Sequence, residues 1–293
     1  MKKLLSLLLC ILLLAGCAPT TYDGPTESAW VITQSNSTMF DHYSGQSSTR
    51  LRTDSYDSYG NLVCSMYYTN GELTGEHRLS YDDRGNCTRY TIWDPAGLIA
   101  RPIVRTDYTY DGQNRVLTST YRTGLGFKTG GDTYTYDDEA NTVIREGSSD
   151  TQTKYLNENG DPIRIVTISH AAGMEMETLY EYDELGRNVK TIHYQDGVLA
   201  STVLTSYDDQ GRMVKNISYD ANGTAIYGST VVYEENTVTT LDLDGNRSVE
   251  TLRPDGLVEK MENYDPDGNL LSRMEYTYQE IQIPAKRNEP CWN

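Results

Sequence analysis

The chain has 293 residues and a formal net charge of −17, with 25 Lys and Arg against 42 Asp and Glu. This acidic balance repels the phosphates of nucleic acid and excludes nucleic acid as an expected partner. Hydrophobic residues make up only 37% of the chain, and its aromatic residues are 24 Tyr against 2 Phe and 3 Trp, where a deep, dry core would favour the reverse. Since Tyr suits half-buried positions on a pleated surface, the composition predicts sheets rather than a thick globular core.

Residues 1–16 are predicted to form a lipoprotein signal peptide. Lys2 and Lys3 precede an apolar run over residues 4–14, which is long enough for a signal helix but too short to span a membrane. The sequence Leu14-Ala15-Gly16-Cys17 resembles the lipobox of bacterial lipoproteins. The resemblance implies cleavage before Cys17 and a lipid on its thiol. The membrane would then be a partner, with the protein in the cell envelope, at the outer face of the cell membrane or at the outer membrane of a two-membrane cell. The alternative is an ordinary secretory signal.

Residues 17–28 are predicted to be a lipidated flexible tether, because Pro19, Gly24 and Pro25 oppose regular structure. The folded domain is expected over residues 29–279, followed by a C-terminal tail over residues 280–293. An odd number of cysteines remains after Cys17, which argues against a disulfide framework. These cysteines are Cys64, Cys87 and Cys291.

A Tyr-Asp-x-x-Gly-Asn/Arg motif recurs along the folded domain. Clear copies begin at Tyr56, Tyr81, Tyr182, Tyr207 and Tyr264, and degenerate copies fill the gaps between them. A second series of turn signals lies between these copies, as at residues 70–71, 196–197 and 222–223. The two series together predict an all-β fold, a repetitive antiparallel meander of about 18 strands whose turns alternate between two edges.

The strand that enters each Tyr-Asp turn carries large side chains on one face, as at Leu79 and Tyr81. The Asp is assigned to the turn, where its carboxylate accepts backbone N–H groups, and the Gly supplies a left-handed conformation. A flat sheet of this size would expose a large aromatic patch, so we expect a curled or spiralling open sheet with that face on its concave side. The repeat turn residues are Tyr81, Asp82, Gly85, Tyr182, Asp183, Gly186, Tyr207, Asp208 and Gly211.

The Tyr-x-Tyr-Asp-x-x-Gly-Arg pattern at residues 180–187, repeated about every 25 residues, resembles the YD repeats of the RHS repeat family. The resemblance covers most of residues 50–279. It implies antiparallel strands that spiral into a hollow shell, which in large polymorphic toxins encloses a C-terminal toxin domain. This chain has fewer repeats and only a short tail where a toxin would lie, so delivery of a toxin is not expected.

Catalytic, cofactor and metal sites find little support. Residues 242–246 and 265–269 resemble the start of a calcium loop, but Thr251 and Met274 stand where the bidentate Glu belongs. The histidines lie in unrelated repeats without a metal-binding or Ser/His/Asp pattern. We therefore expect no metal, no cofactor and no catalytic residues. The four histidines are His42, His77, His170 and His193.

Exposed aromatic rings on a sheet can stack against sugar faces, or they can simply hold the sheet together. The candidates for ligand stacking are Trp93, Tyr108, Tyr134 and Tyr180. The favoured function is a non-enzymatic, envelope-anchored repeat lipoprotein that serves as a structural or adhesive module for a glycan or protein ligand. The alternatives are an accessory or shell remnant of an RHS toxin system and, least favoured, a hydrolase of envelope polysaccharide.

Overall fold

The computed structural model describes residues 26–40, 47–95 and 101–284, and these residues form one all-β sheet of twenty antiparallel strands. No helix in this part of the chain is long and apolar enough to cross a membrane. The strands are β1 (Thr26–Phe40), β2 (Ser47–Tyr56), β3 (Leu62–Thr69), β4 (Glu72–Tyr81), β5 (Cys87–Asp94), β6 (Arg101–Tyr110), β7 (Val116–Thr123), β8 (Lys128–Asp137), β9 (Thr142–Glu146), β10 (Asp150–Leu156), β11 (Pro162–Ser169), β12 (Glu175–Tyr182), β13 (Asn188–Gln195), β14 (Val198–Tyr207), β15 (Met213–Asp220), β16 (Ala225–Tyr233), β17 (Thr237–Asp242), β18 (Arg247–Leu252), β19 (Val258–Tyr264) and β20 (Leu270–Pro284).

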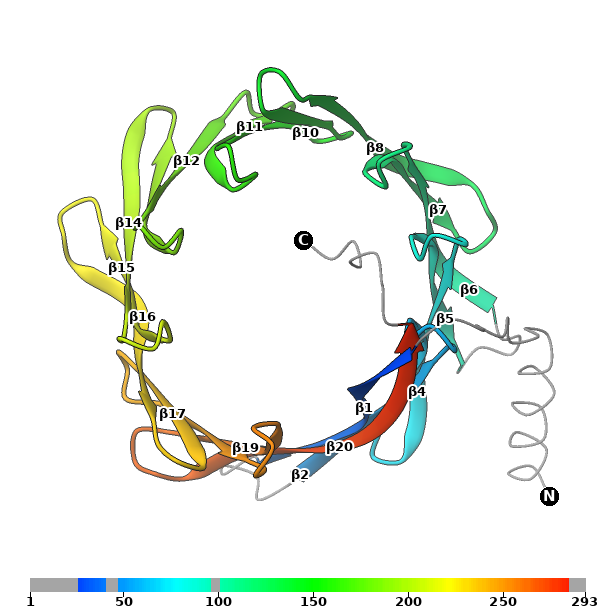
Figure 1. Ribbon diagram of the computed structural model, residues 1–293, viewed down its shortest axis with the longest axis vertical. Helices are drawn as coiled ribbons and strands as arrows, with labels where there is room; N and C mark the ends of the chain where they lie inside the picture. Colours follow the sequence, from blue (N-terminus) through cyan, green and yellow to red (C-terminus); the bar gives the residue numbers. More distant parts are fainter. Residues whose placement is uncertain (1–25, 41–46, 96–100, 285–293) are drawn as a thin grey trace.

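Each strand pairs with the next one along the chain, and β1 pairs with both β2 and β20. The first and last strands therefore seal the sheet into a ring with a wide opening (Figure 1). The all-β antiparallel meander is confirmed. The predicted open sheet of about 18 strands was wrong, because the sheet is closed and has twenty strands.

The sealing strand β1 explains the closure and adds one strand to the expected number. No Tyr-Asp motif marks β1, so the repeat count missed it. Its long pairing with β20 runs from Thr26 opposite Pro284 to Met39 opposite Ser272. The sheet therefore begins three residues before the expected start of the domain, and it extends five residues past the expected end.

The turns alternate between two edges of the ring, as predicted. The edge at which β2, β4, β6, β8, β10, β12, β14, β16 and β18 end is here called the Tyr-Asp edge. Gly85 and Gly211 lie in turns on this edge with φ angles of +84° and +80°. A β-branched side chain would be strained at these angles, which is the reason for the recurring glycine.

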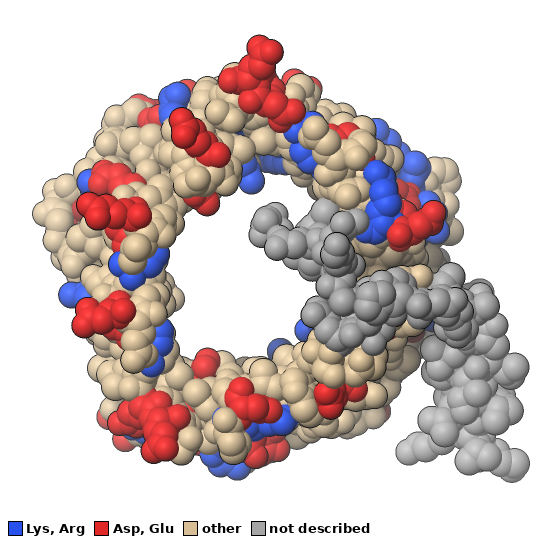
Figure 2. All heavy atoms as spheres, in the orientation of Figure 1, with Lys and Arg blue, Asp and Glu red and all other residues tan. Residues whose placement is uncertain are grey.

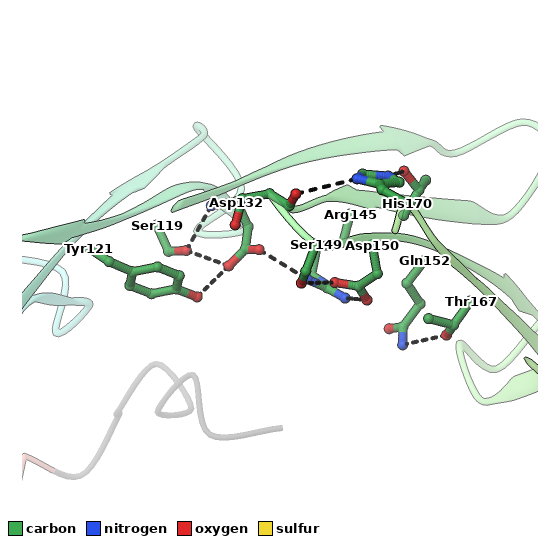
Figure 3. Close-up of polar contacts among 11 residues, drawn as sticks. Ser119, Tyr121, Asp132, Arg145, Ser149, Asp150, Gln152, Thr167 and His170 are labelled. Carbon is green, nitrogen blue, oxygen red and sulfur yellow. Dashed lines mark hydrogen bonds and ion pairs between the residues drawn. The ribbon is translucent and has the colours of Figure 1, made fainter. Parts of the chain in front are cut away.

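The predicted aromatic face lines the concave side of the ring. Tyr108 lies opposite Ser119, which lies opposite Asp132 on the next strand. The side chains of Ser119, Tyr121 and Asp132 point to the inner side of the curved wall in Figure 3. The wall is a single layer. Among the described residues, the buried apolar side chains are Leu79, Ile217 and Val231.

Several predictions fall outside the described residues. They are the signal peptide, the lipidated Cys17, the tether up to residue 25, His42, Cys291 and the tail from residue 285.

Candidate functional site

The Tyr-Asp turns are closed hydrogen-bonded units, and the turn at residues 182–187 shows their geometry. One carboxylate oxygen of Asp183 accepts the backbone N–H groups of Leu185 at 3.0 Å and Arg187 at 2.9 Å. The other oxygen accepts the Nε–H of Arg187 at 2.7 Å. Asp82 and Asp208 repeat this pattern with Asn86 and Arg212. These carboxylates are engaged by their own turns, which is a structural role.

The motif tyrosines connect one repeat to the next along the Tyr-Asp edge. The hydroxyl of Tyr81 donates to the backbone carbonyl of Leu62 at 2.8 Å, so it reaches across to the neighbouring strand. The arginine at the end of a turn can then stack on the following tyrosine, and Arg187 lies 4.7 Å from the centre of the Tyr207 ring. Eight tyrosines donate to a backbone carbonyl in this way: Tyr56, Tyr81, Tyr110, Tyr136, Tyr182, Tyr207, Tyr233 and Tyr278.

The predicted ligand-stacking residues do not form one site. Tyr108 and Tyr134 lie close enough to interact electrostatically on the concave wall, where burial raises the pKa of Tyr108 to about 12. Tyr180 lies on β12, four strands beyond β8. Trp93 lies opposite Glu76 in the sheet, and its side chain is on the other face of the wall. The guanidinium carbon of Arg78 lies 4.5 Å from the centre of the Trp93 ring.

A polar network crosses the concave wall from β7 to β10, and a separate Gln152–Thr167 hydrogen bond joins β10 to β11 (Figure 3). At its centre is Asp132, whose side chain is only 8% exposed. Its carboxylate accepts the hydroxyls of Tyr121 and Ser119 and an N–H of Arg145 at 2.9 Å. Burial alone would raise the pKa of Asp132, but these three donors together hold it below its usual value. Arg145 also pairs with Asp150, so one arginine bridges two carboxylates in this network.

A groove lies on the concave wall beside the seam between β1 and β20, with a volume of about 930 Å³. Trp30, Tyr67 and Tyr276 give it aromatic walls, and Trp30 is 48% exposed. Arg50 and Arg52 project from alternate positions of β2 into the same groove. Aromatic faces beside a few fixed polar groups are typical of ligand sites.

Arg52 is held in place at the floor of the groove. Its Nε–H donates to Asp54 at 2.8 Å, and its guanidinium lies 5.9 Å from the centre of the Tyr67 ring. The hydroxyl of Ser65, which is 2% exposed, donates to the same carboxylate at 2.6 Å. Ser65 therefore fixes the carboxylate of Asp54, and the fixed carboxylate in turn restricts the movement of Arg52.

A row of Asp54, Ser65 and His77 runs across β2, β3 and β4 at this site. In a catalytic triad the histidine lies between the serine and the carboxylate. Here the hydroxyl of Ser65 donates directly to Asp54, and the Nδ1 of His77 shares a 2.8 Å hydrogen bond with the hydroxyl of Tyr90. Burial and the nearby Arg52 lower the pKa of His77. No group of three or more metal-ligating side chains occurs in the described part of the chain, where Cys64 and Cys87 do not form a disulfide with each other.

Sequence reasoning missed the groove because its walls come from opposite ends of the chain. Tyr276 of β20 pairs with Ser35 of β1, which pairs with Arg52 of β2. The alternation of Arg50, Arg52 and Asp54 was a usable signal that one face of β2 is charged. The pairing of β1 with β20 places aromatic rings beside this face, and no motif within a single repeat predicts that pairing.

Charge is distributed unevenly over the ring. Acidic side chains gather in clusters on the rim that faces the viewer in Figure 2, and basic side chains occur along the inner wall. The groove follows this trend. Its charged lining residues are two arginines and one aspartate, a net charge of +1 in a chain whose net charge is −17.

Comparisons with known proteins assign neither a family nor a function. No family model and no curated protein matches the sequence. The pore form of the Photorhabdus luminescens Tc holotoxin is 11% identical with a TM-score of 0.35, and the match covers 78% of this chain but only 15% of the toxin chain. A porin-like protein from Bacteroides uniformis is 11% identical with a TM-score of 0.41, over 87% of this chain and 99% of that one. These similarities are too weak to carry an argument about function.

Proposed function

We propose that this protein is a non-enzymatic, envelope-anchored lipoprotein whose repeat ring binds a glycan in the groove beside the β1–β20 seam. The observation that carries the proposal is the combination of an exposed Trp30, the half-buried rings of Tyr67 and Tyr276, and a fixed arginine in one groove of about 930 Å³. Sugar rings present flat faces of C–H groups with hydroxyls at their edges. Such a ligand fits a site with stacking surfaces and a few polar contacts.

The remainder of the concave wall supports binding rather than chemistry. The turn carboxylates are occupied by their own N–H donors, and Asp132 and Arg145 satisfy one another. Ser65 is buried and donates to Asp54, so its oxygen is not presented to a substrate. A hydrolase would need an accessible nucleophile or a pair of carboxylates beside the ligand, and the groove supports neither.

The test is a glycan-array measurement on the full chain, expressed with its own signal and purified in detergent. Trp30 is exposed and carries a groove wall, so Trp30→Ala should remove a stacking surface without opening a cavity in the core. We expect binding to weaken about tenfold, equivalent to about 1.4 kcal/mol.

The matched control is Tyr227→Ala on β16, because Tyr227 is 73% exposed and lies outside the groove lining. It should bind like the unchanged protein. An array without any saturable glycan, or equal losses in the two variants, would contradict the proposal. Capture of one protein partner instead would favour the toxin-accessory alternative.

A further inference from the structure

We infer that the groove selects an acidic glycan, and that Arg50 and Arg52 bind the carboxylate of a uronic acid residue. The inference rests on the proposed function, which it deepens by naming the substrate class. Its starting point is charge complementarity. The groove has a net charge of +1, although the whole chain is strongly acidic.

Arg50 is the accessible cation of the pair. It is exposed at the groove and makes no ion pair or side-chain hydrogen bond with any residue that the structure describes. A guanidinium has five N–H donors in a planar fork that matches a carboxylate, so Arg50 offers two parallel hydrogen bonds to an incoming acid.

Arg52 supplies a second, preorganised cation on the same face of β2. The Nε–H of Arg52 donates to Asp54. The Arg52 side chain is 41% exposed, which leaves other N–H donors of its guanidinium facing the groove. Side chains two residues apart on a strand lie roughly 6.6–7 Å apart at their Cα atoms, so one ligand can contact both arginines. A fixed donor loses little freedom on binding, which favours affinity.

The aromatic rings select a sugar acid over a small inorganic anion. Trp30 and Tyr276 line the same groove as the two arginines, so the ring of a uronic acid can stack while its carboxylate meets the guanidinium groups. A free phosphate or sulfate would use the cations but leave the aromatic surfaces uncovered.

The experiment compares oligomers of galacturonic, glucuronic and mannuronic acid with the same oligomers carrying methyl-esterified carboxyl groups. The full chain in detergent is titrated with each, in the unchanged form and as Arg50→Gln and Arg50→Lys. The unchanged protein should bind at least one acid form about tenfold more tightly than its ester. Arg50→Gln should reduce this preference, because Arg52 alone then meets the carboxylate, and Arg50→Lys should reduce it less.

The matched control is Arg247→Gln, an exposed arginine on β18 that lies outside this groove. Equal affinity for acid and ester, an unchanged preference in Arg50→Gln, or no binding of any acid oligomer would overturn the inference. If neutral glycans on the array still bind and Trp30→Ala still weakens them, the proposed function survives that failure. If no glycan binds at all, both fail.

Discussion

The hydroxyl of a motif tyrosine performs a task that its ring alone cannot. In Tyr81 the hydroxyl donates to the carbonyl of Leu62, and the same contact recurs around the Tyr-Asp edge. This explains the choice of tyrosine over phenylalanine at these eight of the 24 Tyr positions, since phenylalanine would remove the hydroxyl donor from each of these carbonyls.

Replacement of one such hydroxyl should therefore cost stability. We expect Tyr81→Phe to lower the free energy of unfolding by about 0.5–1.5 kcal/mol, the usual net value of one hydrogen bond. The measurement is the urea midpoint of the purified chain. Tyr227→Phe is the control, because Tyr227 is 73% exposed and its hydroxyl donates to none of the described residues. Equal midpoints for the two variants would show that the contact contributes nothing.

The Tyr-Asp turn is the element that the sequence predicts best. The spacing of Tyr182, Asp183 and Gly186 was sufficient to expect a turn with a left-handed glycine, and Gly186 has a φ of +75°. Local hydrogen bonds determine this geometry, so a short motif contains the information. The stacking of Arg187 on Tyr207 was not predicted, because it depends on how successive repeats align.

The turns should also make the fold sensitive to acid. Side-chain hydrogen bonds from Arg187 and Asn246 hold the pKa values of Asp183 and Asp242 below the ordinary 3.8. A carboxylate with a lowered pKa in the folded state stabilises the fold above its unfolded pKa, and this contribution is lost as the pH falls through the folded value.

The thermal midpoint should therefore change little between about pH 7 and pH 5 and fall steeply below about pH 4. Relief of charge repulsion in a chain of net charge −17 acts in the opposite direction, so the sign of the change distinguishes the two effects. Circular dichroism melting at several pH values measures it. A midpoint at pH 3 equal to or above that at pH 6 would contradict the role of the turn carboxylates.

At the scale of the whole molecule, closure was the property that the sequence did not reveal. A meander with regular turns is compatible with an open sheet, a spiral or a ring, because each repeat contacts only its neighbours. The ring is decided by β1 and β20, where Thr33 donates to the carbonyl of Thr277 across 244 residues of sequence. A closed sheet leaves no long unpaired edge, so the backbone N–H and C=O groups along the described strands find partners although few apolar side chains are buried there.

Closure also creates the candidate site, since the groove exists only where β20, β1 and β2 lie side by side. The candidates taken from sequence, such as Trp93 and Tyr180, came from single repeats and lie apart. The repeat pattern was therefore sufficient to predict the sheet and its concave aromatic face, but it did not predict the groove.

The most direct test of the account is to fill the groove and measure glycan binding. Ser35 lies in the groove lining, between Tyr276 and Arg52, so Ser35→Trp places a large ring in the space that the ligand would occupy. Ser55→Trp is the control, because Ser55 is exposed on β2 at a position that alternates with Asp54 and lies outside the groove. The account predicts that the control binds the array ligand like the unchanged protein and that Ser35→Trp does not. Binding by a folded Ser35→Trp variant at the unchanged affinity would contradict it.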